Sequence, residues 1–187
     1  MTAAETQHLI TADEFFENPK YERCELIDGE VNPVSPTGGH HGVVVLRIGR
    51  KIGAFVDDHQ LGLAFGAETG FLLGRDPDTL RAPDVAFIAK DRSAEADIPK
   101  YIPIPPDLAV EVNSPSDRIS DVTAKANWWL ANGTRQVWVV DPPSRTVTVY
   151  HPDGAAHVWK DGETFGGGEV LPGFTLAVGE LFGGGAG

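Results

Sequence analysis

The chain has 187 residues, of which 41% are hydrophobic and 22% are charged. This length and composition are typical of one globular domain and argue against a disordered chain. The formal net charge of −12 argues against tight electrostatic binding of nucleic acid, because such binding relies on Lys and Arg side chains.

The N-terminal third of the chain predicts three elements. Residues 11–16 carry a capping-box pattern, with Thr11 as N-cap and Glu14 three positions later, which predicts a short helix. Residues 21–31 alternate around Asp28-Gly29, a dipeptide that favours a tight β-hairpin. Residues 40–58 place apolar side chains at helical spacing and predict a longer helix.

The rest of the chain alternates strand and helix patterns. We predict strands at 61–73 (two, around a turn), 81–89, 107–113, 136–140 and 145–150, and a helix at 117–132. This order predicts an α/β fold of the α+β type, in which helices flank a mixed β-sheet. We expect a single domain over residues 1–187, with a core at about 21–182 and a flexible tail at 183–187.

Two acidic residues stand in strand-like surroundings. Asp84 follows Pro83, and Glu111 lies inside the apolar run DLAVEVN. An ionised carboxylate in a central strand is unfavourable unless a countercharge is present, and two on neighbouring strands repel each other. A divalent cation such as Mg²⁺ would remove both problems. The alternative is that each carboxylate pairs with its own Arg or Lys.

Lys125 lies in the predicted helix that directly follows the Glu111 strand. Asp117, Asp121 and Lys125 share one stripe of that helix, so one interpretation is a surface ion pair between Asp121 and Lys125. The other is that Lys125 points toward the two carboxylates, where an ammonium could orient a water molecule or stabilise developing negative charge.

Several segments together resemble one known family. They are YERCELIDGEV, APDVAFIA, PPDLAVEVNSPSDRISDVTAKANWWLANGTRQVWVVDP and LPGFTL, and they run from about Tyr21 to Phe182. In this order they resemble the Uma2 family, whose members are assigned to the PD-(D/E)xK nuclease superfamily. The long central segment is the most specific part.

The resemblance implies a restriction-endonuclease-like αβββαβ core and dependence on Mg²⁺ or Mn²⁺. Asp84 matches the aspartate of the PD motif, and Glu111 matches the (D/E) position. Asn113 stands where the superfamily motif has lysine, so the chain departs from that motif. In Uma2-like sequences the lysine comes from the next helix, and Lys125 matches that position.

Three further residues are candidates for the same site. Glu68 lies in a strand-like segment that could neighbour Asp84, and it could join the metal ligands. Glu25, in ELIDGE, matches an acidic position of the family and could contact substrate or metal-bound water. His41 opens the long helix, whose free N–H groups favour phosphate, so it is a candidate for substrate binding. The alternative for the acids is a solvated strand face, and for the histidine an exposed helix start.

The implied activity is metal-dependent endonucleolytic hydrolysis of phosphodiester bonds. The implied partner is nucleic acid, with DNA preferred over RNA as the expectation, and the contact is transient. A homodimer is an expectation by analogy with nucleases that cut both strands. Two alternatives remain: a catalytically silent binding protein on a nuclease fold, and a metal-dependent hydrolase of a small phosphorylated compound. No run approaches ~18 apolar residues, and no basic leader is visible, so we expect a cytoplasmic protein.

Overall fold

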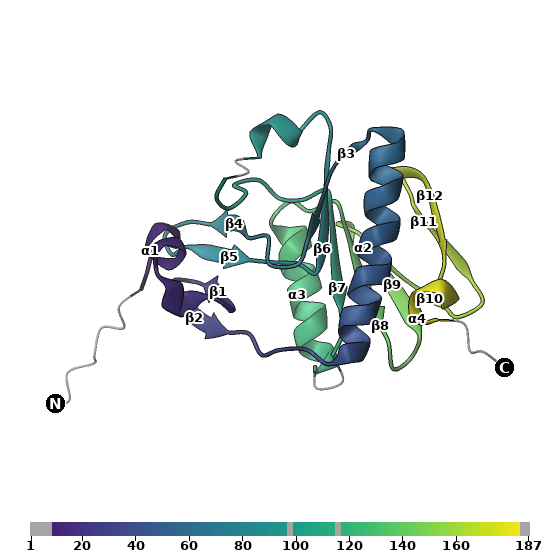
Figure 1. Ribbon diagram of the computed structural model, residues 1–187, viewed down its shortest axis with the longest axis horizontal. Helices are drawn as coiled ribbons and strands as arrows, with labels where there is room; N and C mark the ends of the chain where they lie inside the picture. Colours follow the sequence, from purple (N-terminus) through teal and green to yellow (C-terminus); the bar gives the residue numbers. More distant parts are fainter. Residues whose placement is uncertain (1–8, 97–98, 115–116, 184–187) are drawn as a thin grey trace.

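The computed structural model describes residues 9–96, 99–114 and 117–183 (Figure 1). The helices are α1 (Ala12–Glu17), α2 (Gly39–His59), α3 (Ile119–Ala131) and α4 (Gly179–Phe182), with 3₁₀ helices η1 (Pro19–Tyr21) and η2 (Ser93–Glu95). The strands are β1 (Cys24–Ile27), β2 (Glu30–Pro33), β3 (Gly62–Gly66), β4 (Phe71–Gly74), β5 (Thr79–Arg81), β6 (Val85–Ala89), β7 (Leu108–Val112), β8 (Gln136–Asp141), β9 (Thr146–Tyr150), β10 (Ala156–Lys160), β11 (Thr164–Gly167) and β12 (Leu171–Ala177). The flexible tail expected from residue 183 falls mainly on residues 184–187, which lie outside the described ranges.

Six strands form the main sheet, in the order β10-β9-β8-β7-β6-β3. β7 and β8 are parallel, and the other neighbouring pairs are antiparallel. The central strands β7 and β8 are buried along nearly their whole length, which explains their continuous apolar sequences. The sequence-based fold class is confirmed. The order α2-β3-β6-β7-α3-β8 follows the αβββαβ core, with β4 and β5 inserted between β3 and β6.

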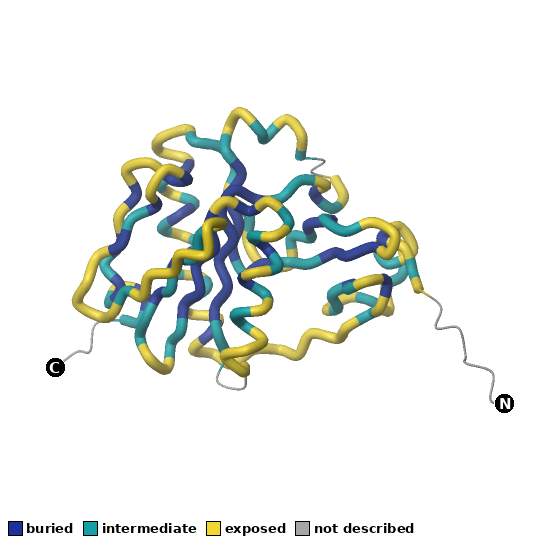
Figure 2. The backbone as a smooth tube through the Cα atoms, turned by 180° about the vertical axis from the view of Figure 1, so that it is seen from behind, coloured by how far each residue is buried: buried dark blue, intermediate teal, exposed yellow. Residues whose placement is uncertain are grey.

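The two long helices cover opposite faces of this sheet. Side chains alternate along a strand, so Val110 joins the core under α2 whereas Ala109 joins the core under α3. Ile48 of α2 and Trp129 of α3 are fully buried in these two cores. Each large apolar side chain buried in this way contributes roughly 1.5–3 kcal/mol. Figure 2 shows the buried backbone concentrated in the central strands.

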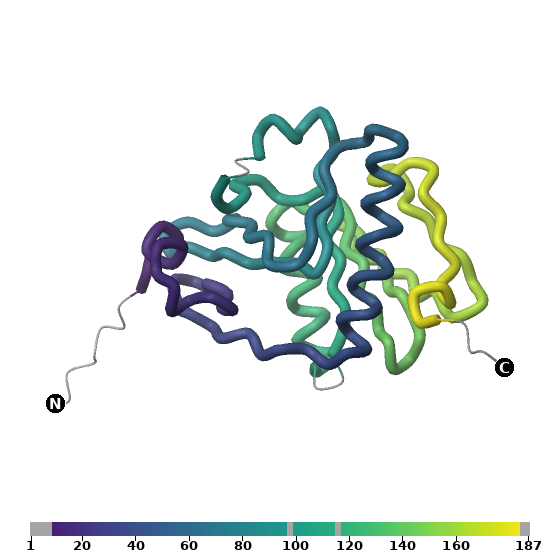
Figure 3. The backbone as a smooth tube through the Cα atoms, viewed as in Figure 1, coloured from purple at the N-terminus to yellow at the C-terminus, as the bar shows by residue number. Residues whose placement is uncertain are grey.

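A second, smaller sheet has the order β2-β1-β5-β4 and is built from segments of the first half of the chain. The turn between β1 and β2 has positive φ at Asp28 (51°) and Gly29 (75°), as a type I′ hairpin turn requires. The predicted hairpin is thereby confirmed. Figure 3 shows these segments beside the main sheet, on the side opposite the C-terminal strands. We refer to β2-β1-β5-β4 as the small sheet.

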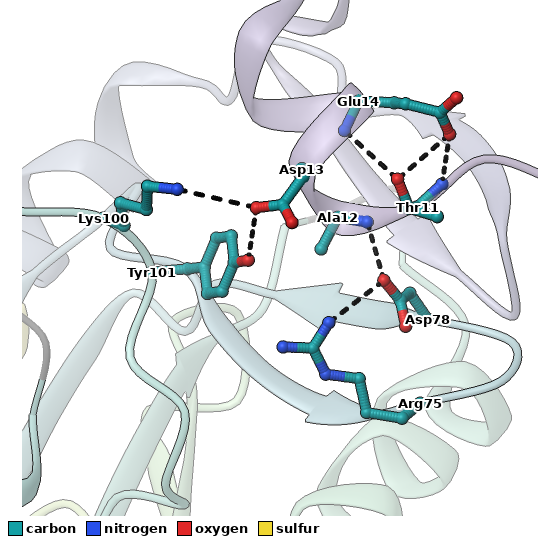
Figure 4. Close-up of polar contacts among 8 residues, drawn as sticks. All are labelled: Thr11, Ala12, Asp13, Glu14, Arg75, Asp78, Lys100 and Tyr101. Atoms are coloured by element: carbon teal, nitrogen blue, oxygen red, sulfur yellow. Dashed lines mark hydrogen bonds and ion pairs between the residues drawn. The ribbon is translucent and has the colours of Figure 1, made fainter.

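α1 attaches to the small sheet through polar contacts (Figure 4). The predicted capping box is present: the Thr11 hydroxyl accepts a hydrogen bond from the Glu14 N–H, and the Glu14 carboxylate accepts one from the Thr11 N–H. The buried carboxylate of Asp78 accepts a hydrogen bond from the Ala12 N–H at 2.7 Å. The helix start is therefore satisfied both locally and by the loop before β5.

The C-terminal segment completes the core on the α2 side of the main sheet. β11 and β12 form a separate antiparallel pair, and their side chains Phe165 and Phe174 pack against Trp138 of β8. α4 contacts α2 through the ion pair between Lys51 and Glu180. This segment, whose place the sequence did not indicate, thus covers apolar surface that α2 leaves open.

Candidate active site

Asp84 and Glu111 lie at the same end of neighbouring strands. β6 and β7 pair antiparallel with Val85 opposite Val110, so the next step of the register sets Asp84 opposite Glu111. Opposed residues of an antiparallel pair project to the same side. Asp84 stands immediately before β6 and not inside a strand as predicted, because the segment 79–89 breaks into β5 and β6 around Ala82-Pro83.

The Asp84 carboxylate is held by two groups. Its Oδ2 accepts a hydrogen bond from the Val112 N–H at 2.7 Å, beyond the last paired residues of β6 and β7. His41 Nε2, from the first turn of α2, lies 3.4 Å from the same oxygen. The hydrogen bond with Asp84 raises the pKa of His41 although burial opposes it. His41 is buried, so the interpretation as an exposed helix start is wrong for it, while His40 is exposed.

Glu111 is the most strongly perturbed acid of the site. Its side chain is about nine-tenths buried, Oε1 accepts a hydrogen bond from Trp129 Nε1 at 2.7 Å, and Oε2 lies 3.0 Å from Lys125 Nζ. Burial raises its pKa to about 7; the Lys125 charge counteracts this, and the nearby Asp84 charge adds to it. The two carboxylates are therefore close enough to repel each other, as expected from the sequence.

Lys125 points into the site. Its Nζ lies near Glu111 Oε2 and 3.4 Å from Glu25 Oε1, and no ion pair with Asp121 occurs in the described structure. α3 begins only at Ile119, and Asp117 precedes it, accepting a hydrogen bond from the Ser114 N–H. Burial lowers the pKa of Lys125, but the two carboxylates outweigh burial and raise it above its ordinary value.

Glu25 reaches the site from the small sheet. Its Oε2 lies 3.6 Å from Arg81 Nε, and its side chain is about 15% exposed, so it does not lie on a solvated strand face. The Arg81 guanidinium stacks over the Trp128 ring at 4.9 Å. Two sheets and two helices therefore contribute side chains to one acidic and basic cluster.

Comparisons with known proteins show the family of the chain and a solved structure of similar fold. The family model Uma2, described as "Putative restriction endonuclease", matches residues 12–179. The chain belongs to the Uma2 family. A crystal structure described as a putative nuclease belonging to DUF820, from Anabaena variabilis ATCC 29413, is 26% identical with a TM-score of 0.77. The alignment covers 92% of this chain and 97% of that chain. A search of curated proteins found no match.

Within this Uma2 chain, Asn113, the position at which a lysine would be expected from the motif considered above, makes a different contact. Asn113 Nδ2 donates a hydrogen bond to Asp141 Oδ1 at 3.1 Å, on neighbouring strand β8. Lys125 supplies the ammonium beside Glu111 from the helix. Lys125 thus reaches the Glu111 carboxylate from the helix that follows β7, and not from two positions further along the strand.

Glu68 does not fit its predicted place. It lies in the exposed turn after β3 with a positive φ of 72°, and not in a strand beside Asp84. Among the described residues it forms no ion pair with the cluster. The turn predicted between the two strands of 61–73 is present, and Glu68 lies in it.

Arg81 and Trp129 are contacts of the site that the sequence reasoning missed. Arg81 stands three residues before Asp84, and Trp129 stands four residues after Lys125 on the same helix face. The second spacing was a usable signal, because i and i+4 side chains are neighbours. The spacing of Arg81 from Asp84 was not such a signal, since the contact of Arg81 with the site depends on how the small sheet packs against α3.

Carboxylate oxygens are the ligands that Mg²⁺ prefers, so the donor set of Asp84 and Glu111 fits such an ion. In the described ranges, no group of three or more His, Cys, Asp or Glu side chains is arranged to hold a metal. Mg²⁺ sites in phosphoryl-transfer enzymes often use only one or two carboxylates, with water and phosphate as the other ligands.

No helix of the described chain has the length and apolarity needed to cross a bilayer.

Proposed function

We propose that this Uma2 protein is a metal-dependent endonuclease that hydrolyses phosphodiester bonds of nucleic acid, with DNA as the proposed substrate. The observation that carries the proposal is the approach of Lys125 Nζ to 3.0 Å from Glu111 Oε2, with Asp84 opposite Glu111 across β6 and β7. A lysine beside two carboxylates on one end of a sheet is the arrangement that this chemistry needs.

Asp84 and Glu111 would hold the metal ion, Mg²⁺ or Mn²⁺. When bound, it would supply positive charge to both carboxylates, polarise the phosphoryl group and lower the pKa of a coordinated water. Trp129 keeps one oxygen of Glu111 in place, and the Val112 N–H keeps one oxygen of Asp84 in place. The backbone and the indole thereby orient both ligands before substrate arrives.

Lys125 would act on the reacting groups themselves. Its ammonium can donate to the attacking water and to the phosphoryl oxygens, where negative charge develops. Burial makes this electrostatic effect stronger than it would be in water. His41 lies beside Asp84 in the first turn of α2, and no side chain of the described residues caps the start of that helix. The N–H groups of this helix end would therefore be available to a phosphate of the substrate, next to His41.

The excess of acidic residues favours a second candidate substrate class, small phosphorylated compounds. A net charge of −12 is unusual for a protein that binds a long polyanion, and a small phosphorylated compound would need no basic groove. The same site residues would serve that reaction. The choice between the two is a question of substrate and not of mechanism.

The test is cleavage of supercoiled plasmid and of single-stranded DNA with Mg²⁺, with Mn²⁺ and with EDTA. We expect metal-dependent nicking by the wild type and none by Asp84→Ala, Glu111→Ala or Lys125→Ala. Asp121→Ala, one turn before Lys125 and exposed, is the matched control and should retain activity.

Calorimetry with Mn²⁺ completes the test. No heat of binding to the wild type would exclude both hydrolase functions and leave a binding protein on a nuclease fold. Binding that disappears in Glu111→Ala, without cleavage of any nucleic acid, would favour the small phosphorylated substrate.

A further inference from the structure

Lys125 has two carboxylate partners that come from different sheets. Glu111 belongs to the main sheet, and Glu25 belongs to the small sheet. If Glu111 binds a divalent cation, its charge is shared with that cation, and the cation repels the neighbouring ammonium. Glu25 is then the remaining acid that can keep Lys125 in the site.

Glu25 is itself held in place by Arg81. β1 and β5 pair antiparallel with Leu26 opposite Leu80, so the register sets Glu25 opposite Arg81, with 3.6 Å between Oε2 and Nε. Arg81 Nε is buried and has no hydrogen-bond partner in the described structure, and the Glu25 carboxylate compensates its charge as an ion-pair partner. Stacking on Trp128, three residues after Lys125, fixes the guanidinium plane against α3.

We propose that Glu25, anchored by Arg81, is a positioning residue for Lys125, and that the small sheet is thereby part of the active centre. The inference rests on the proposed function, because Glu25 is needed to hold Lys125 in place once Glu111 binds the metal ion. The last strand of the small sheet, β5, is also joined to Asp84 through Ala82-Pro83. The way the small sheet packs therefore determines the positions of both Glu25 and Asp84.

The first test follows the Lys125 ammonium by ¹H–¹⁵N NMR, independently of activity. We expect Glu25→Gln to speed exchange of the ammonium protons with water several-fold without metal, and to broaden the signal beyond detection with Mg²⁺. Wild type should keep the signal in both conditions. Glu30→Gln is the matched control, because Glu30 lies on the same hairpin and is exposed.

The second test separates positioning from folding. In steady-state cleavage, Glu25→Gln should lower kcat by about 10–100-fold, the range found when a group that orients a ligand is removed. KM and the Mn²⁺ affinity should stay close to wild type, whereas the melting temperature should fall because Arg81 loses its carboxylate partner. A loss of Mn²⁺ affinity parallel to the loss of kcat would indicate a structural role and overturn the inference.

The outcomes are distinguishable from failure of the proposed function. If Glu25→Gln leaves the Lys125 exchange rate at the wild-type value with and without Mg²⁺, the inference is wrong. If calorimetry detects no binding of Mg²⁺ or Mn²⁺ to wild type, the proposed metal site is wrong, and the metal-free exchange rates of wild type and Glu25→Gln still decide on Glu25. If Glu25→Gln does not fold, Arg81→Gln replaces it: faster exchange of the Lys125 ammonium supports the inference, and an unchanged rate overturns it.

Discussion

At the scale of single residues, Glu111 is the group whose protonation couples the site to stability. Its pKa rises from 4.5 to about 7 on folding, mainly through burial. Between these two values the folded state binds more protons than the unfolded state. Stability from this group is therefore present at low pH and is lost as pH rises through about 7. The loss amounts to about 3 kcal/mol at most.

Glu111→Gln should remove this contribution. Without metal, we expect the wild-type free energy of unfolding to fall from pH 5 to pH 8 relative to that of Glu111→Gln. Urea unfolding at several pH values measures it, and the exposed Glu169→Gln is the control. Parallel pH profiles for wild type and Glu111→Gln would show that Glu111 does not titrate in this range.

Asp84→Asn probes the other carboxylate. An asparagine oxygen can still accept the hydrogen bond from Val112, so the metal-free free energy of unfolding should change by about 1 kcal/mol or less. Mg²⁺ at 100 times its dissociation constant should stabilise wild type by about 2.7 kcal/mol, and the variant less. Thermal melts with and without Mg²⁺ measure both quantities. An equal rise in melting temperature for the two proteins would argue against a shared metal site.

At the scale of helices and strands, the regular elements could be predicted from the sequence because their signals are local. The capping box of α1, the Asp28-Gly29 turn and the apolar spacing of α2 each depend on neighbouring residues, and all three predictions are confirmed. The Asp84 and Glu111 pair could also be picked out from the sequence, because a charged residue within an apolar strand, as Glu111 is, or directly before one, as Asp84 is, stands out.

What could not be predicted depends on contacts between distant segments. The sequence does not show that β1 and β5 form a sheet apart from the main one, and therefore Arg81 was missed. Glu68 was assigned to a strand because its positive φ, which places it in the turn after β3, occurs at a residue that is not glycine. The choice for Lys125 between Asp121 and the two carboxylates was undecided for the same reason: Asp121 is near in sequence, whereas Glu111 approaches Lys125 only in the folded chain.

Two acidic residues lie at opposite ends of β7: Asp107, a structural acid directly before the strand, and Glu111, the proposed catalytic acid near its C-terminal end. Asp107, fully buried, accepts hydrogen bonds from the Ala89 N–H at 2.8 Å and from Arg92 at 2.9 Å, and Arg135 lies 3.5 Å away. Asp107→Ala would leave Arg92 without its buried partner, so we expect a loss of about 3–5 kcal/mol in the free energy of unfolding.

The stabilisation of Asp107→Ala by Mg²⁺ should nevertheless equal that of wild type, because the change lies at the opposite end of the strand. Urea unfolding at 25 °C with and without Mg²⁺ tests this separation. A reduced Mg²⁺ effect would mean that the two ends of β7 are coupled, contrary to the site described above.

At the scale of the whole molecule, the charge distribution limits how nucleic acid can bind. Lys and Arg number 15 against 27 Asp and Glu, and at least eight of the 15 form ion pairs with acids of the same chain. At most seven of the 15 cations are therefore without an acid of the same chain as partner, against an excess of 12 negative charges. Contact with a polyanion should be brief and confined to the neighbourhood of the site.

Salt dependence tests this view directly. Affinity falls with salt in proportion to the number of phosphates neutralised, and proteins with 6–10 such contacts lose about 10³–10⁵ in affinity between 50 and 200 mM salt. For this chain we expect a loss below about 100-fold, which corresponds to roughly three contacts or fewer. Glu111→Gln allows the measurement by fluorescence anisotropy on a short labelled duplex, because it should not cleave. A loss of 10³-fold or more would reveal a basic surface that the overall charge conceals, and would make a long duplex the natural substrate.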